Sequence, residues 1–196
     1  AFENAFTVGK LQLTKTVSPS NATWATAPFT LHVACTVGFP NPGTPVYTKD
    51  VAFPKTGGTS LIENLPTNAS CTTTEPPSGS GGANSTTITG GTRTIGNGTT
   101  VSTGVTNTFT TGSVTIAKAL KVNGVATTAK PWVSASYWMT LSCTRTVNGS
   151  SESLDLSKVG GAVKELKAPS FAATWSGLPR GANSTATETS IDYPSG

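Results

Sequence analysis

Hydrophobic and polar residues alternate along much of this chain, a pattern typical of half-buried β-strands. In residues 9–17 the leucine and valine side chains fall on one side of such a strand, and Lys15 falls on that same side. Residues 112–120 repeat the pattern, again with a lysine, Lys118, on the apolar side. Because desolvation disfavours an ammonium group, each buried lysine predicts a partner inside the protein.

Helix signals are scarce, and strand signals are frequent. The chain contains 21 Gly and 13 Pro, and the runs between them are rich in Thr and Val with a period of two. Residues 157–166 are the one stretch expected to hold a helical turn. The Gly-, Ser- and Thr-rich residues 78–100 are expected to form a long hairpin loop with short strands. The sequence therefore predicts an all-β protein.

Four segments recur in the same order, which predicts two tandem domains. The paired segments are 4–9 with 107–112, 9–17 with 112–120, 29–36 with 137–144, and 65–75 with 178–188. We expect a first domain over residues 7–109 and a second over residues 110–196 that lacks its last strand. Residues 1–6 are then the closing strand of a preceding repeat or a donor strand.

Charge and hydropathy exclude several classes of function. Charged residues make up 11% of the chain, well below the usual ~25%, and the net charge of +4 reflects few acidic residues rather than a basic cluster. The sequence has no basic run with interleaved aromatic residues, so nucleic-acid binding is not expected. No apolar run approaches the ~18–20 residues that a membrane span needs.

Three polar residues of the first domain fall on inward faces, namely Lys15, Glu75 and Asn107. A lysine, a carboxyl and a carboxamide in an apolar pocket are the parts of an internal isopeptide bond. The pocket keeps the amine neutral, the amine attacks the Asn carbonyl, and the carboxyl carries protons while ammonia leaves. Such a self-reaction needs no cofactor and makes the protein no enzyme for outside substrates. The structural alternative is a lysine that snorkels to solvent, with Glu75 and Asn107 in turns.

This order of residues resembles the CnaB-type immunoglobulin-like domains of Gram-positive pilins and adhesins. More closely, Cys35-Thr36, the run Cys-Thr-Thr-Thr-Glu that ends at Glu75 and the closing Val-Thr-Asn-Thr-Phe are similar to a Cys-bearing repeat of actinobacterial surface proteins whose function is unknown. The resemblance implies two tandem immunoglobulin-like β-sandwich domains. It also implies that Lys15 and Asn107 are the bonded pair and that Glu75 is the catalytic acid.

The second domain repeats the lysine and the glutamate as Lys118 and Glu188 but has no third partner within the sequence. Three explanations are open: a longer array of domains, loss of the bond, or strand donation. In strand donation, residues 2–6 of one subunit complete the second domain of its neighbour, and Asn4 bonds to Lys118 of the other chain.

The cysteines and the single histidine predict no metal or catalytic site. Cys35 and Cys71 both face inward, which predicts either a disulfide or two buried thiols. Cys143 matches Cys35, but its expected partner position holds Ser184, so we expect a free buried thiol. The cysteine spacing excludes a Cys-based zinc site, and His32 has no nucleophile motif beside it.

The sequence thus predicts a structural stalk, filament or pilus module at a bacterial cell surface. Its partners would be like subunits or neighbouring repeats. The alternative is an extracellular adhesin module that binds a glycan or a host protein, through the loops of residues 78–100 or through an exposed aromatic residue such as Trp138.

Overall fold

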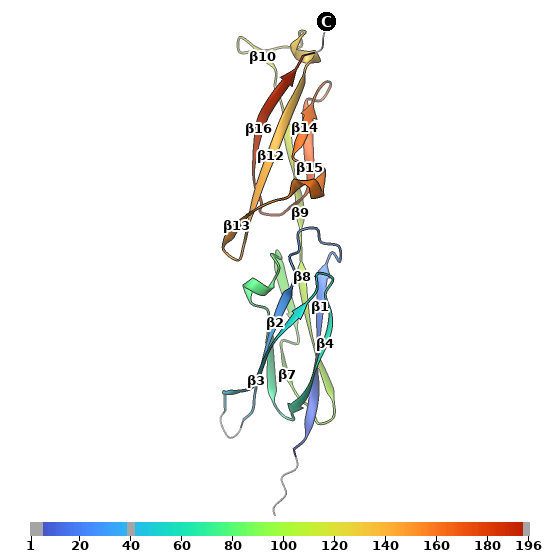
Figure 1. Cartoon of the computed structure of the whole chain (residues 1–196), viewed down its shortest axis with the longest axis vertical. Helices are drawn as coiled ribbons and strands as arrows, with labels where there is room; N and C mark the ends of the chain where they lie inside the picture. The colour runs from blue at the N-terminus through green and yellow to red at the C-terminus, as the bar shows by residue number, and fades with distance from the viewer. Residues whose placement is uncertain (1–5, 39–41, 194–196) are drawn as a thin grey trace, which may run out of the picture. The chain divides into compact units, whose positions relative to one another are not determined.

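The computed structural model describes residues 6–38 and 42–193 of the chain. Within these residues, strands form nearly all of the regular secondary structure, beside short 3-10 helices, which confirms the all-β prediction (Figure 1). None of the helices in the described chain has the length and apolar character needed to cross a membrane. The chain divides into two compact units, Ala1–Phe109 and Thr110–Gly196.

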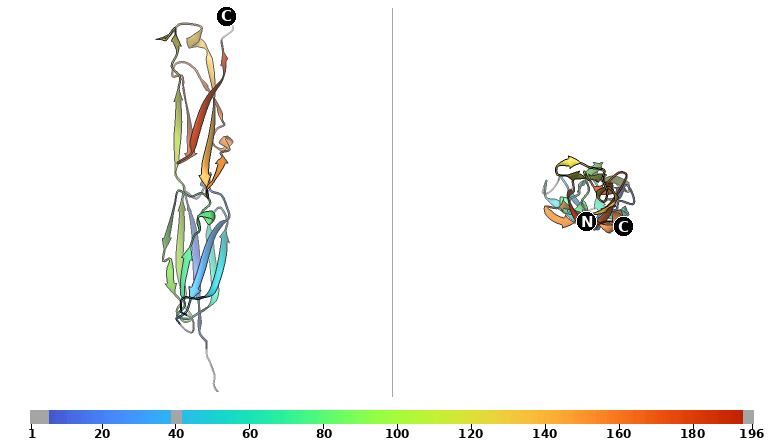
Figure 2. Two further views of the ribbon diagram at one scale, coloured as in Figure 1. Left: turned by 90° about the vertical axis from the view of Figure 1, so that its left-hand side faces the viewer. Right: turned by 90° about the horizontal axis from the view of Figure 1, so that it is seen from above.

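The first unit contains two four-stranded sheets that face each other (Figures 1 and 2). One sheet has the order β4-β1-β8-β6, and the other has the order β3-β2-β5-β7. The strands of the first sheet are β1 (Val8–Ser18), β4 (Gly58–Pro66), β6 (Ser85–Thr89) and β8 (Thr100–Thr108). Those of the second are β2 (Phe29–Thr36), β3 (Pro45–Phe53), β5 (Ser70–Thr74) and β7 (Thr92–Thr94), and the 3-10 helix η1 (Pro77–Gly79) follows β5.

Strand β1 lies at the centre of the first unit. It pairs with β4 in the antiparallel sense and with β8 in the parallel sense, so the first and last strands of the unit lie side by side. Its side chains alternate between buried and more exposed positions, because successive residues of a strand point to opposite faces. The inward ones, among them Leu11 and Leu13, pack against inward residues of β2 such as Phe29 and Leu31 in one continuous core.

A disulfide joins the two middle strands of the second sheet. Cys35 of β2 and Cys71 of β5 are direct register partners, and their sulfur atoms are 2.07 Å apart. Both residues belong to the buried core of the first unit. The covalent link therefore ties two strands that are separated by a long stretch of sequence.

The second unit is built from a larger sheet and a two-stranded sheet. In the larger sheet, β12 (Ser136–Val147) pairs with β13 (Ser150–Ser153), β14 (Val163–Leu166) and β16 (Asn183–Asp192). The smaller sheet pairs β9 (Thr111–Ala117) with β15 (Ala172–Pro179). The remaining elements are the short ladder of β10 (Lys121–Val122) with β11 (Val125–Ala126) and the 3-10 helices η2 (Trp132–Ser134) and η3 (Leu156–Val159).

Strand β9 is shorter than the sequence pattern of residues 112–120 predicts, since it ends at Ala117, before Lys118. The Lys118 N–H still donates to the carbonyl oxygen of Phe171, at 2.9 Å. Among the described residues β9 pairs only with β15, whereas β1 in the first unit lies between two strands. With ladder bonds on one side only, fewer backbone groups hold the strand extended.

The structure adds detail to two other expectations. The helical turn expected in residues 157–166 is η3, which the Asp155 side chain caps through the N–H of Ser157 and which Gly160 ends at a φ of 92°. Residues 163–166 of that stretch form β14. Residues 78–100 contain short strands, as expected, but β6 and β7 do not form a hairpin because they belong to different sheets.

The register of β12 against β16 generates a test. Cys143 lies opposite Ser184, its sulfur 2.9 Å from the Ser184 hydroxyl, in the same strand positions as the first unit's disulfide. Ser184→Cys should therefore form a disulfide and, on the chain-entropy account, stabilise the second unit by about 4 kcal/mol. The measurements are a free-thiol assay and thermal unfolding.

The matched control is Thr185→Cys, whose side chain points to the opposite face of β16 and should leave both thiols free. Two free thiols in Ser184→Cys under oxidising conditions would contradict the register.

Candidate cross-linking site

The first unit encloses an ion pair between Lys15 and Glu75. Lys15 lies on the inward face of β1, and Glu75 follows β5 directly. The Lys15 Nζ donates to Glu75 Oε1 at 2.6 Å, and both side chains are 0% exposed. Lys15 thus does not snorkel to solvent, and Glu75 does not lie in a solvated turn.

Asn107 completes this cluster from the neighbouring strand β8. It is fully buried, and its Nδ2 donates to Glu75 Oε1 at 3.1 Å and to the carbonyl oxygen of Ser80 at 2.9 Å. Because β1 and β8 are adjacent and parallel, with Val17 opposite Asn107, the side chains of Lys15 and Asn107 reach the same carboxyl oxygen. The structure therefore brings together all three residues that the sequence singled out in the first domain.

Thr86 is a fourth member of the cluster that the sequence did not indicate. It lies on β6, directly opposite Asn107. Its Oγ1 is 2.9 Å from Glu75 Oε2 and 3.0 Å from Asn107 Oδ1. A hydroxyl has a single proton, so it can donate to the Asn107 oxygen while it accepts from a protonated Glu75. In the sequence, nothing distinguishes Thr86 from the other threonines of the same Thr-rich stretch.

Besides the carboxyl of Glu75, the Lys15 amine faces an aromatic ring. Its Nζ lies 5.0 Å from the ring centroid of Phe29, within the range of a cation–π contact. Burial lowers the pKa of the Lys15 amine below its ordinary value, although the hydrogen bond and the charge of Glu75 act in the opposite direction. Lowering this pKa eases the release of a proton to Glu75, which yields the nucleophilic form of the amine.

The chemical capacity of the site follows from one oxygen atom. Glu75 Oε1 contacts the nitrogen of Lys15 and the nitrogen of Asn107 at once. A carboxyl in this position can take a proton from the first nitrogen and give it to the second without moving. Thr86, on the other side of the carboxamide, donates to the carbonyl oxygen on which negative charge would develop.

The second unit has the lysine and the glutamate but a more open site. The Lys118 Nζ lies 2.5 Å from Glu188 Oε2, and the two side chains are 22% and 33% exposed. The amine also lies 4.4 Å from the ring centroid of Tyr137. Asn4, the expected partner of Lys118 from a second chain, lies outside the described residues.

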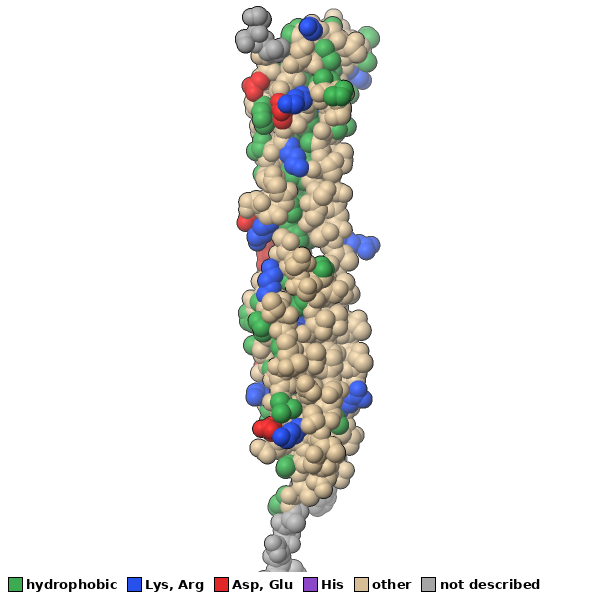
Figure 3. All heavy atoms as spheres, turned by 90° about the vertical axis from the view of Figure 1, so that its right-hand side faces the viewer, with side chains coloured by type: hydrophobic (Ala, Val, Ile, Leu, Met, Phe, Trp, Pro, Cys, Tyr) green, Lys and Arg blue, Asp and Glu red, His purple; other side chains and the backbone are tan. Residues whose placement is uncertain are grey.

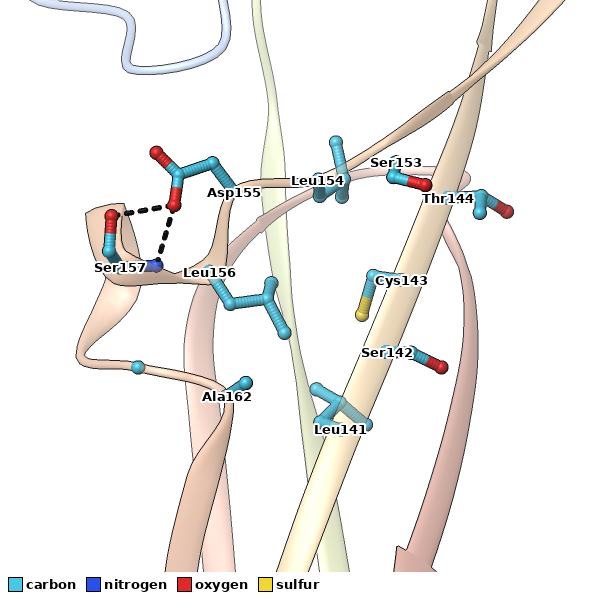
Figure 4. Close-up of a pocket in the computed structure, with 11 residues that line it drawn as sticks. Leu141, Ser142, Cys143, Thr144, Ser153, Leu154, Asp155, Leu156, Ser157 and Ala162 are labelled. Atoms are coloured by element: carbon cyan, nitrogen blue, oxygen red, sulfur yellow. Dashed lines mark hydrogen bonds between the residues drawn. The ribbon is translucent and has the colours of Figure 1, made fainter.

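One hollow in the second unit has a single charged residue, Asp155, in its lining. It measures about 460 Å³ and lies beside β12, where Leu141, Cys143 and Leu156 point into it and Ser142 points away (Figure 4). Asp155 at its edge accepts hydrogen bonds from the N–H and the hydroxyl of Ser157, which lower the pKa of its carboxyl. Cys143 is a buried free thiol beside Ser184, as the sequence predicts.

The other candidate residues from the sequence, Trp138 and His32, form hydrogen bonds or ion pairs with neighbouring side chains. Trp138 is half-buried, and its Nε1–H donates to Asp192 at 2.7 Å. His32, which is partly buried, pairs with Asp50 at 2.6 Å. Within the described residues, no group of three or more His, Cys, Asp or Glu side chains is placed to hold a metal ion.

Comparison with known proteins identifies the chain by its first unit. A protein family described as "Domain of unknown function (DUF5979)" matches residues 11–110, and the chain belongs to this family. The match spans the cluster of Lys15, Glu75, Thr86 and Asn107. No curated protein matches the sequence.

Several solved structures are similar in fold. They include the Bacillus anthracis TIE protein (16% identity, TM-score 0.41), a streptococcal ancillary pilin (14%, 0.41) and the major pilin T-13 of Streptococcus pyogenes (12%, 0.46). The alignments cover 93%, 96% and 94% of this chain and 28%, 55% and 82% of those proteins. The chain therefore spans about a quarter and about half of the first two.

The buried ion pair generates a stability prediction. Glu75→Ala leaves an unpaired ammonium inside the first unit, which typically costs about 3–5 kcal/mol. Adding Lys15→Met should recover most of that loss, because an apolar side chain of similar length then fills the site. Neither variant retains the pair, so the comparison isolates the cost of burying the lone charge, as measured by denaturant unfolding.

The second unit supplies the matched control. Glu188→Ala with and without Lys118→Met should differ much less, because water reaches the Lys118 amine. Equal rescue in the two units would contradict the contrast in burial.

Proposed function

We propose that this chain is a structural module of a filament or stalk at a bacterial cell surface, and that its first unit is closed by an isopeptide bond between Lys15 and Asn107. The observation that carries the proposal is the position of Glu75 Oε1, within hydrogen-bonding distance of both nitrogens that the reaction exchanges.

The reaction would run between the buried side chains of Lys15, Glu75 and Asn107 without an outside reactant. Lys15 transfers a proton to Glu75, and its neutral Nζ attacks Cγ of Asn107. Thr86 donates to the Asn107 oxygen as the tetrahedral intermediate forms. Glu75 moves a proton from Nζ to Nδ2, the Cγ–Nδ2 bond breaks, and ammonia leaves. One amide is formed and one is lost, so the bond forms once and the site is then spent.

The topology gives this bond a mechanical consequence. Lys15 and Asn107 lie on the first and last strands of the unit, which are adjacent and parallel. Tension applied to the two ends of the unit would then pass from β1 to β8 through a covalent bond. The strands in between would stay folded because no force would reach them.

The surface and the cysteines fit an extracellular setting. On the face drawn in Figure 3, Lys, Arg, Asp and Glu occupy a small part of the visible surface, most of which is neither charged nor hydrophobic side chain. The disulfide of the first unit is of the kind that persists in oxidising compartments.

A second role is favoured by the edge of β9 that has no partner strand in the part of the chain that the structure describes. A strand from another copy, added beside β9 as β8 lies beside β1, would bring its own carboxamide to Lys118 and Glu188. The units would then assemble with like subunits through intermolecular isopeptide bonds.

Single-molecule extension tests the mechanical role of the first unit. The wild-type unit should not lengthen between Lys15 and Asn107 at forces that unfold ordinary β-sandwiches. Asn107→Ala, studied with a reductant that opens the disulfide, should release the whole segment between these two residues. Asn97→Ala, at an exposed turn of the same unit, serves as control and should behave as wild type. Full extension of the wild-type segment would refute the proposal.

Thr86 provides a kinetic prediction. Thr86→Val should slow bond formation by about a hundredfold or more, because the developing oxyanion loses its donor. Thr86→Ser should react at close to the wild-type rate, and Thr87→Val, on the opposite face of β6, should have no effect. The rate is followed by the intact mass of freshly synthesised chain, quenched in denaturant at intervals. Wild-type rates in Thr86→Val would remove the hydroxyl from the mechanism.

A further inference from the structure

Within its described residues, the second unit has an unpaired strand edge along β9, which ends next to Lys118. In the first unit β1 has β4 on one side and β8 on the other, whereas among the described residues β9 has only β15. Exposure follows this difference. Leu11 and Leu13 of β1 are completely buried, but Val114 and Ile116, at the matching positions of β9, are partly exposed. The second unit therefore lacks, within its described residues, the strand that covers this side of the core in the first.

A hollow of about 200 Å³ lies at the end of that edge, next to Lys118. Three aromatic residues, Trp132, Tyr137 and Tyr193, contribute to its lining, together with Ala119, Leu120, Ile191 and the polar Lys118, Lys121 and Thr127. A cavity of about 150 Å³ with apolar walls is enough to bind benzene. The hollow therefore has room for one aromatic side chain.

The first unit shows what occupies the matching place. Phe109 follows Asn107 by two residues, is buried, and lies with its ring centroid 6.4 Å from that of Phe29. Its N–H donates to the carbonyl oxygen of Ser18, three residues after Lys15. In the first unit, then, an aromatic ring two residues beyond the cluster Asn packs beside the ring that faces the lysine.

The second unit likewise has an aromatic ring facing its lysine, with a hollow where the second ring would lie. Tyr137 faces the Lys118 amine as Phe29 faces the Lys15 amine. Lys121, three residues after Lys118, lines the hollow and corresponds to Ser18. The hollow thus lies where the counterpart of Phe109 would pack.

The chain also contains a segment, residues 4–6, that could supply the second ring. Asn4-Ala5-Phe6 has the spacing of Asn107-Thr108-Phe109, which places Asn4 and Phe6 on one face of an extended strand. Phe6 is 89% exposed, although a fully buried Phe side chain typically stabilises a protein by about 1.5–3 kcal/mol. An aromatic ring exposed to this degree, two residues after an Asn, matches the hollow beside Lys118 in chemistry and in register.

We propose that the hollow beside Lys118 is a socket for Phe6 of a second copy of this chain. This inference rests on the proposed function and deepens it, because it names the contact that selects the partner. Residues 2–6 of the second copy lie parallel to residues 118–122, directly after the end of β9, Phe6 fills the socket, and Asn4 meets Lys118 and Glu188. The amide then forms between Lys118 Nζ and Asn4 Cγ, ammonia leaves, and Glu188 carries the proton. Donor and acceptor surfaces differ, so the contact is head-to-tail and produces an open filament.

The test mixes two full-length variants that can each play one part. Lys118→Met can only donate its strand covalently, and Asn4→Ala can only accept one. The mixture should yield a covalent dimer on a denaturing, reducing gel, with Asn4 of one chain linked to Lys118 of the other. Phe6→Ala in the donor should reduce the dimer at a fixed time by about tenfold or more. Ala5→Ser, which alters the opposite face of the strand, is the matched control and should leave the yield unchanged.

The Lys15–Asn107 bond of the same chains separates the possible failures. If that bond forms but no dimer appears, or if Phe6→Ala dimerises as well as the unmodified donor, the socket is refuted and the proposed internal bond of the first unit stands. If neither bond forms, the proposed cross-linking chemistry fails. In that case, sedimentation equilibrium tests whether the chains still associate reversibly through the socket. Reversible association that Phe6→Ala abolishes would support it, and a monomeric mixture would refute it.

Discussion

The structure depends on the cost of burying one ammonium group. Lys15 lies on the inward face of the central strand of the first unit, where water does not reach it. A charge in such a place must be paired, neutralised or consumed by a reaction. The carboxyl of Glu75 pairs it, and the carboxamide of Asn107 offers a way to consume it. Once the amide forms, Lys15 carries no charge, so the free-energy cost of burying an ammonium group is removed and a covalent bond links the two strands.

The two units illustrate the same constraint with different degrees of closure. Both place a lysine against a glutamate and above an aromatic ring. In the first unit β8 lies beside the pair and delivers Asn107, and the side chains of Lys15, Glu75 and Asn107 are all shielded from water. In the second unit no described strand lies on that side of β9, and both charges remain partly solvated. A dry site favours the neutral amine, so we expect Lys118 to become reactive only when a strand covers it.

Much of this arrangement could be predicted from the sequence because it depends on local alternation. The inward position of Lys15 followed from the period of two in β1, and the inward position of Glu75 followed from its parity with Cys71. Thr86 could not be predicted, because its role depends on the pairing of β6 with β8, and a Thr-rich stretch offers several equivalent registers. The end of β9 at Ala117 could not be predicted from the sequence either, because it depends on how many strands pair with β9. The separation of β6 and β7 into different sheets was missed for a similar reason: a turn between two short strands does not reveal whether they pair.

The most direct test of the central claim is the mass of the intact chain under denaturing and reducing conditions, followed by peptide mapping around Lys15. The account predicts a chain lighter than its sequence by one ammonia for the first unit, with the Lys15 peptide joined to the Asn107 peptide. An unshifted mass in fully folded protein, with separate Lys15 and Asn107 peptides, would contradict it. The cluster would then be a buried ion pair with a satisfied carboxamide, and the first unit would depend on packing and its disulfide alone.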